Sequence, residues 1–496
     1  MEAISETAIK IRVNQDNPWW NKPSYVAPES NYPKRVYFAP FKSLALNFGV
    51  KRGTILLGPR RVGKTFMLKQ LIDQASRGGI DPNDILYVSV DTPVYSGIGL
   101  EDFLYYMPKF DSSKPSVIIF DEIQYLKNWE VHLKDLIDSY PNVKFIASGS
   151  AAAALQLKSK ESGAGRFTDF MLPPLTFYEF LLFSEEDEKF IRSPARSETE
   201  KHTDGSYEIV DIDGLNGRFI DYLNYGGYPE AVLNDEIRKN PERFIRNDIV
   251  DKVLLKDLPS LYGINEIQQL NRLFSFLAFN TGKEASLENI TRESGLAKAT
   301  IKRYIEYLES AFLIIKISMV DDNCKTMKRE RNFKIYLSNP SMMAALFAPV
   351  EATEPDQIGH LAESAIFSQW QHSPTFKNLR YARWRNEGEV DIVYLQGPKF
   401  DPAWIGEIKW SDRIAKQEHK ETRSMATMLR NKRGIKNGFF TSRTIEAEIV
   451  IEGRTVWIVP AAAYCYTVGR NVTSRFDFLA AQGDQSGPGV VSKQDA

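Results

Sequence analysis

Residues 54–65 read Thr54-Ile55-Leu56-Leu57-Gly58-Pro59-Arg60-Arg61-Val62-Gly63-Lys64-Thr65. An apolar run that predicts a strand leads into the pattern G-x-x-x-x-G-K-T, and a run predicted to be helical follows through Gln74. A triphosphate is bound by backbone N–H groups at a helix N-terminus, and Gly58 and Gly63 leave room for it to approach them. We therefore predict a phosphate-binding P-loop, in which Lys64 reaches the β- and γ-phosphates and the Thr65 hydroxyl holds Mg²⁺.

The composition is that of an ordinary globular protein. The chain has 496 residues, of which 43% are hydrophobic and 26% charged, and this length predicts roughly two to four domains. The net charge of −1 excludes a global field that would attract nucleic acid or membrane, so any such attraction is local. The two cysteines, Cys324 and Cys465, lie far apart without metal-ligand neighbours, which favours a reducing cytoplasm over a zinc site or disulfide framework. No apolar run reaches about 18 residues, so we expect neither a membrane span nor a secretory signal.

Three further apolar runs, at residues 85–90, 117–120 and 143–147, are separated by helical segments. Such alternation predicts a parallel sheet that is covered on both faces. Ligands bind these sheets at the carboxyl ends of the strands. Polar residues stand at those ends here, namely Asp91, Asp121, Glu122, Ser148 and Ser150.

Asp121 and Glu122 form the second candidate nucleotide motif. At the tip of a buried strand, Asp121 would contact Mg²⁺ directly or through water, and Glu122 would orient and deprotonate the attacking water. The alternative is a strand-to-helix cap, since Asp is common before a helix. Ser150 would sense the γ-phosphate or simply end its strand. The expected nucleotide-binding residues are Gly58, Pro59, Arg60, Arg61, Val62, Gly63, Lys64, Thr65, Phe66, Asp121 and Ser150.

Arg166 is the candidate arginine finger, supplied within its own chain or to a neighbouring copy in a homo-oligomer. Arg60 and Arg61 are further candidates for this role.

Several motifs occur in one order along the chain: Gly-Pro-Arg-Arg-Val-Gly-Lys-Thr, Asp-Glu-Ile-Gln, Gly-Ser, Gly-Arg, Leu-Pro-Pro-Leu-Thr-Phe-Tyr-Glu-Phe and Tyr-Gly-Gly-Tyr-Pro-Glu. Over residues 35–460 the chain resembles prokaryotic AAA-type ATPases whose P-loop domain precedes a winged helix and a restriction-nuclease-like (PD-(D/E)xK) domain. The resemblance implies an α/β fold, with a P-loop ATPase parallel sheet, a helical lid, a winged helix and a C-terminal α/β domain. It implies ATP and Mg²⁺ as cofactors, and little about biological role.

We expect seven segments. They are an N-terminal arm (1–50) that packs in extended form on the next domain, the P-loop core (51–183), an exposed acidic insertion (184–216), a helical lid (217–264), a winged helix (265–345), the restriction-nuclease-like domain (346–478) and a disordered tail (479–496).

The predicted winged helix carries basic residues suited to phosphate contacts. They are Lys298, Lys302 and Arg303 on its second helix and Lys325, Lys328, Arg329, Arg331 and Lys334 on its wing. Residues 283–334 have only a small basic surplus, so protein contacts are an equal alternative.

The last candidate site lies in the C-terminal segment. A helix at 359–371 carries Glu363, a strand at 388–394 carries Asp391, and a strand at 404–410 carries Glu407 and Lys409. Residues two apart share a strand face, and Asp391 followed by Glu-x-Lys resembles the active site of restriction-nuclease-like folds. The resemblance implies that Asp391 and Glu407 hold Mg²⁺, with Glu363 as a third ligand, while Lys409 stabilises the phosphorane charge or helps to activate water. The alternative is a Glu407–Lys409 salt bridge on a domain without activity.

The sequence therefore predicts a cytoplasmic ATP-binding and hydrolysing AAA-type ATPase, coupled to a metal-dependent nuclease domain that acts on nucleic acid, with DNA favoured over RNA. The alternative is a nucleotide-controlled switch or assembly protein with an inactive nuclease-like docking domain.

Overall fold

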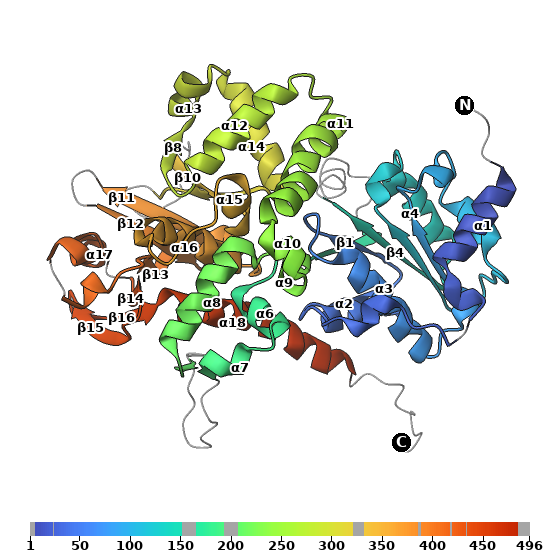
Figure 1. The fold of residues 1–496 in the computed structure, drawn as a ribbon, viewed down its shortest axis with the longest axis horizontal. Coiled ribbons are helices and arrows are strands. Elements are labelled where there is room, and N and C mark those ends of the chain that lie inside the picture. The colour runs from blue at the N-terminus through green and yellow to red at the C-terminus, as the bar shows by residue number, and fades with distance from the viewer. Residues whose placement is uncertain are drawn as a thin grey trace. The chain divides into compact units, whose positions relative to one another are not determined.

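The computed structural model describes residues 5–22, 24–150, 165–192, 207–320, 332–384, 388–416, 419–432 and 434–484. Contacts divide the chain into two compact units, Met1–Pro173 with Thr473–Ala496, and Pro174–Val472 (Figure 1). Part of the acidic insertion and the predicted wing residues Lys325, Lys328, Arg329 and Arg331 lie outside the described residues. Within the described ranges no helix is long and apolar enough to cross a bilayer.

The first unit is built on the parallel sheet that the sequence predicted, and its strand order is β2-β3-β4-β1-β5. The strands are β1 (Gly53–Leu57), β2 (Ile85–Ser89), β3 (Ser116–Asp121), β4 (Val143–Gly149) and β5 (Phe167–Met171). The principal helices are α2 (Phe38–Ala45), α3 (Lys64–Arg77) and α4 (Trp129–Ser139), and they contact β1, β3 and β4 respectively. Because only β4 separates β1 from β3, the P-loop after β1 and the acidic residues after β3 emerge close together at one edge.

The N-terminal arm packs on the edge strand β2, but as helix α1 (Glu6–Asp16) and a short 3-10 helix, η1 (Pro18–Trp20), rather than in extended form. The Asn17 amide donates to Tyr87 O (2.9 Å), and Tyr87 N donates to Asn17 Oδ1 (2.7 Å). Both indole N–H groups, of Trp19 and Trp20, donate to Ile85 O. Side chains therefore take the place of a neighbouring strand along this edge.

The second unit begins with a helical layer around an aromatic core of Phe177, Phe180, Phe219 and Tyr222. Its helices are α6 (Phe177–Phe183), α7 (Asp187–Phe190), α8 (Ile212–Tyr225), α9 (Pro229–Leu233), α10 (Asp235–Lys239), the π-helical η8 (Glu242–Asp251) and η9 (Val253–Asp257), α11 (Leu258–Tyr262) and α15 (Ser341–Leu346). A two-stranded ribbon, β6 (Ile191–Arg192) and β7 (Glu208–Ile209), joins α7 to α8.

Three helices and a three-stranded antiparallel sheet of order β8-β10-β9 follow. They are α12 (Ile267–Phe279), β8 (Glu284–Ser286), α13 (Leu287–Ser294), α14 (Lys298–Ser310), β9 (Ile314–Ser318) and β10 (Asn332–Leu337). Lys298 and Lys302 are exposed but lie near Glu288 and Glu306, at 2.5 and 4.0 Å between charged atoms.

The C-terminal part of the unit is a six-stranded mixed sheet of order β11-β12-β13-β14-β16-β15. Its elements are α16 (Pro355–Trp370), β11 (Leu379–Trp384), β12 (Gly388–Gln396), β13 (Asp401–Glu407), α17 (His419–Asn431), β14 (Asn437–Ser442), β15 (Ala447–Ile451), β16 (Arg454–Pro460) and, as far as Val472, α18 (Ala461–Asp484). Helix α17 crosses over between the parallel strands β13 and β14. Helix α18 continues to Asp484 and so overlaps the start of the segment that we expect to be a disordered tail, residues 479–496.

Candidate functional site

The P-loop connects β1 to α3 by a turn in which two positions require glycine. A Cβ added to Gly58 would lie 2.2 Å from Leu172 O, well inside van der Waals contact. Gly63 has a φ of 95°, a left-handed conformation that side chains disfavour. The backbone can therefore pack tightly against Leu172, the residue after β5, and still turn into the N-terminus of α3.

Lys64 is folded back on its own loop. Its ammonium is buried and donates to Gly58 O (3.0 Å) and Pro59 O (2.8 Å). Arg35 of the arm donates to Val62 O (2.8 Å), which ties the arm to the loop. Phe66, the residue after Thr65, stays 44% exposed, with its ring 5.4 Å from that of Tyr32.

Thr65 and Asp121 meet, although they are far apart in sequence. Thr65 Oγ1 donates to Asp121 Oδ2 (2.7 Å), and Tyr87 OH donates to the same oxygen (2.8 Å). Ser148 Oγ donates to the other oxygen, Oδ1. A hydroxyl beside a carboxylate is the hard oxygen pair that suits Mg²⁺, so these residues fit the ion that the motif implies.

Glu122 follows in a left-handed conformation, with a φ of 56°. Its N–H donates to Asp121 Oδ1 (3.1 Å) and Ser148 Oγ (3.2 Å), and its carboxylate accepts from Gln124. Burial raises the pKa of Glu122, and the Lys64 ammonium opposes that rise.

Gln124 also joins Glu122 to Ser150, since its Oε1 accepts from Ser150 N (3.3 Å). Ser150 Oγ is buried and has no hydrogen-bond partner among the residues that the structure describes. Sequence reasoning missed Gln124, although it is the last residue of the Asp-Glu-Ile-Gln motif. It missed Tyr87 too, because no local signal marks a strand tyrosine.

Arg166 lies away from the P-loop of its own chain. Its carbonyl accepts from Gly53 N at the start of β1, and its guanidinium pairs with Asp138 (2.5 Å). The P-loop follows the opposite end of β1, and five residues of strand span on the order of 15 Å. The prediction that Arg166 acts within its own chain is therefore not supported by its position. Arg60 lies nearer to the site and donates to Tyr125 OH (3.3 Å).

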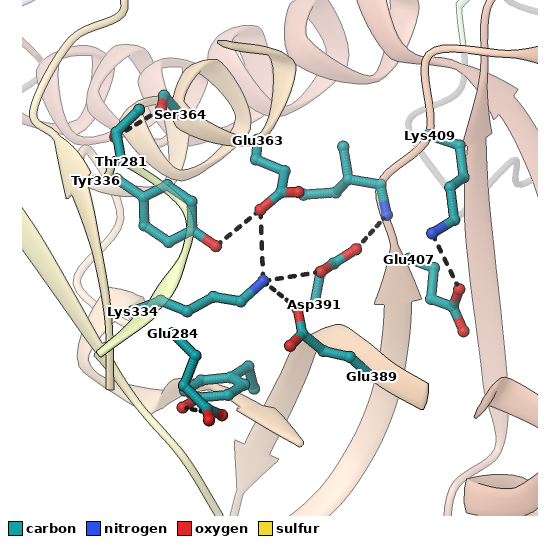
Figure 2. A network of polar contacts seen from close by, with 12 residues as sticks. Thr281, Glu284, Lys334, Tyr336, Glu363, Ser364, Glu389, Asp391, Glu407 and Lys409 are labelled. Atoms are coloured by element: carbon teal, nitrogen blue, oxygen red, sulfur yellow. Dashed lines mark hydrogen bonds and ion pairs between the residues drawn. The ribbon is translucent and has the colours of Figure 1, made fainter. Parts of the chain in front are cut away.

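In the second unit, carboxylates of α16 and β12 converge on one buried ammonium, that of Lys334 on β10 (Figure 2). Lys334 Nζ lies 3.1 Å from Asp391 Oδ1 and 3.5 Å from Glu363 Oε2, and it also pairs with Glu389. The Lys334 side chain is only 3% exposed, so our expectation of a phosphate contact from this residue was wrong. Strand β10 buries that side chain against the C-terminal sheet.

Glu407 and Lys409 remain together, although β13 ends at Glu407. Our expectation that Lys409 lies in this strand was wrong, because its backbone N–H and C=O are both bonded by the Thr441 hydroxyl (2.6 and 2.7 Å) instead of a strand partner. Lys409 Nζ lies 3.6 Å from Glu407 Oε2. Glu407 Oε1 is buried and has no hydrogen-bond partner within the described part of the chain.

Burial dominates the electrostatics of these acids. It raises the pKa of Glu407 to about 7 against the pull of Lys409, and it raises the pKa of Glu363 to about 7 with help from the Asp391 charge. Burial also opposes ionisation of Asp391, but the Lys334 and Lys409 ammonium groups outweigh it and leave that pKa lowered.

The metal ligands expected from sequence do not form a metal centre in this conformation. Among the described residues, no group of three or more His, Cys, Asp or Glu side chains is arranged to hold a metal ion. Asp391 and Glu363 contact Lys334 instead, and Asp391 Oδ2 accepts from Ile408 N (2.9 Å).

Comparison with known proteins supports the fold described for the first unit. Residues 50–181 match the family model of an AAA domain, and residues 216–354 match that of a domain of unknown function (DUF8612). With the parallel sheet, the first match supports an AAA-type P-loop ATPase domain. Both matched ranges end before the six-stranded sheet, so neither supports a nuclease-like domain there.

Two curated relatives are uncharacterized proteins. One, from Haemophilus influenzae, is 27% identical over 275 residues, which cover 54% of this chain and 62% of the relative. The other, from Methanocaldococcus jannaschii, is 27% identical over 288 residues, covering 56% and 59%. The matches thus span less than two thirds of these relatives. A solved structure of C. elegans PCH-2 is 14% identical and covers 56% of this chain and 65% of that one, with a TM-score of 0.25 that is too low to carry an argument.

Proposed function

We propose that the first unit is a Mg²⁺-dependent ATPase. The observation that carries the proposal is the 2.7 Å hydrogen bond between Thr65 and Asp121, which joins the P-loop helix to the tip of β3. When bound between these two residues, Mg²⁺ would neutralise charge on the phosphate oxygens.

The protein's own groups have distinct roles in this proposal. Lys64 exchanges the carbonyl oxygens of Gly58 and Pro59 for phosphate oxygens when the nucleotide binds. Glu122 accepts a proton from the attacking water, and its raised pKa makes it a stronger base than an exposed glutamate. Gln124 holds the Glu122 carboxylate and links it to Ser150, the candidate γ-phosphate sensor.

The test compares three variants with wild type. K64A should lose ATP binding, which calorimetry measures, whereas E122Q should bind Mg-ATP and lose about 100- to 10,000-fold in turnover. K51A removes an exposed lysine before β1 and should leave both quantities unchanged. Equal hydrolysis by wild type, K64A and E122Q would refute these roles.

For the second unit we propose a winged-helix element over residues 265–345 and a nuclease-like C-terminal sheet that acts on DNA rather than RNA. Two features of the sheet support its nuclease-like assignment. Asp391 and Glu407 flank the paired residues Ile392 and Gly406 on β12 and β13, so their side chains stand on one face. Glu407 also has the buried carboxylate oxygen without a partner.

The residues as they stand do not fit a divalent ion, because Lys334 fills the position between the carboxylates. We therefore derive no cleavage step through a metal. The same observation favours a second candidate function, a nucleotide-controlled switch whose C-terminal sheet serves only for docking.

A cleavage assay separates the two candidates. Single- and double-stranded DNA and RNA would be incubated with Mg²⁺ or Mn²⁺, with and without ATP. Cleavage that D391A and K409A abolish supports a nuclease. No cleavage, with slow ATP turnover and an ATP-dependent change in oligomeric mass, supports the switch.

A further inference from the structure

Lys334 comes from a different element than the carboxylates that it contacts. It lies on β10, the middle strand of the small sheet, whereas Glu363 belongs to α16 and Glu389 and Asp391 to β12. Figure 2 shows its Nζ between the three carboxylates. The ammonium at the centre of the cluster therefore belongs to the small sheet and not to the C-terminal sheet.

The same face of β10 supplies a second contact. Tyr336, two residues on, donates its hydroxyl to Glu363 Oε2 (2.9 Å). Lys334 pairs with three carboxylates, and a lysine ammonium carries its charge at neutral pH. The strand thus presents one positive charge and one hydroxyl to this group of acids, in addition to the Lys409 ammonium on the other side of Asp391.

The Lys334 ammonium supplies the positive charge that a divalent ion would otherwise supply to these acids. Buried carboxylates require a positive charge nearby, and a primary ammonium and a metal ion compete for the same oxygens. Asp391 has both oxygens engaged, by Lys334 and by Ile408 N. Glu407 Oε1, on the neighbouring strand, is buried and has no hydrogen-bond partner among the described residues.

We propose that Lys334 is a built-in cation that occupies the C-terminal carboxylate site and keeps a divalent ion out of it while β10 is in place. Admission of the ion then requires Lys334 to withdraw with its strand. The proposal rests on the metal-binding role suggested above for Asp391, Glu363 and Glu407, and it makes the small sheet a gate on that site.

The experiment measures Mn²⁺ binding to the full chain without nucleotide, by the loss of the free-ion electron paramagnetic resonance signal. K334M keeps the length of the side chain and removes its charge. We expect at least about tenfold tighter binding of one Mn²⁺ than in wild type, and D391N added to K334M should abolish that gain. Because D391N leaves the site at Thr65 and Asp121 intact, any Mn²⁺ that the double variant still binds can be assigned to that other site.

Controls cover folding and specificity. K316M removes a lysine from the adjacent strand β9 and should bind Mn²⁺ as wild type does. E389Q is the second variant, for the case that K334M does not fold. It removes one ion pair with Lys334 at a side chain that is 27% exposed, and it should give a smaller gain in Mn²⁺ affinity than K334M.

The proposal is overturned if wild type already binds Mn²⁺ as tightly as K334M at a site sensitive to D391N. It is also overturned if neither folded K334M nor E389Q gains such a site. A gain of Mn²⁺ without DNA cleavage upholds the gate and refutes the nuclease, so the two failures are distinguishable.

Discussion

Replacing Glu407 with Gln should stabilise the second unit at pH 8 relative to wild type, and much less so at pH 5. The cause is the buried carboxyl, whose pKa rises from 4.5 to about 7 on folding. A raised pKa means that the folded state holds the proton more tightly than the unfolded state does. Wild-type stability therefore falls as pH rises from about 4.5 to 7, and the penalty is complete above 7.

The magnitude follows from these two values. One pH unit between them corresponds to about 1.4 kcal/mol, so the full penalty at pH 8 is about 3 kcal/mol, while at pH 5 it is below about 1 kcal/mol. Gln has nearly the same volume and no charge to lose. The difference in unfolding free energy between E407Q and wild type should therefore change by about 2 kcal/mol between pH 5 and 8, whatever constant offset the amide introduces.

Thermal unfolding of both proteins from pH 5 to 8 measures this change, which corresponds to about 5 °C in Tm for a unit of this size. Glu363 also has a pKa raised to about 7, but it is present in both proteins and its effect cancels. E448Q changes an exposed glutamate of β15 and should follow wild type at every pH. A stability difference between E407Q and wild type that is the same at pH 5 and pH 8 would mean that the Glu407 carboxyl does not have a raised pKa in the folded state.

Three further predictions concern the first unit. G58A would put a Cβ 2.2 Å from a backbone oxygen and should abolish ATP binding in a filter or calorimetric assay, whereas G217A, at a helical position with open space, should keep it. Y87F removes one hydrogen bond to Asp121 and should raise the Mg²⁺ concentration for half-maximal ATPase activity by about tenfold, because a bond to a charged group contributes about 1.5–3 kcal/mol and about 1.4 kcal/mol is a factor of ten. An unchanged Mg²⁺ dependence would mean that the hydroxyl does not position this carboxylate. N17A leaves the Tyr87 backbone N–H and C=O without their partners and should lower the unfolding free energy by about 1–3 kcal/mol in denaturant titrations, so wild-type stability would argue against the edge role of the arm.

Local patterns identified much of the first unit. A strand, a glycine-framed turn and a helix are encoded by neighbouring residues, so the elements around Gly58 and Lys64 could be predicted without knowledge of the rest of the chain. The same holds for Asp121 at the end of a buried strand. A parallel sheet follows from apolar runs between helices, since only burial on both faces accounts for strands without polar residues.

The second unit shows where such reasoning stops. The sequence placed Lys334 on a solvated wing, because a lysine in a basic stretch is normally exposed. Its burial depends on how β10 lies against β12 and α16, which no pattern within β10 records. The backbone conformation of Lys409 could not be predicted locally either. The Thr441 hydroxyl that hydrogen-bonds its N–H and C=O lies on a strand 32 residues further along the chain.

Neighbouring residues alone identify the glycine-framed turn before Lys64 and the buried strand that ends at Asp121, because each depends on a few consecutive side chains. The folded chain was needed to show that Thr65 hydrogen-bonds Asp121, that Arg166 lies at the far edge of its sheet, and that Lys334 is buried among the C-terminal carboxylates. The physical reason is that such contacts depend on strand order and on how distant elements pack, and many orders are compatible with the same local pattern of apolar and polar residues.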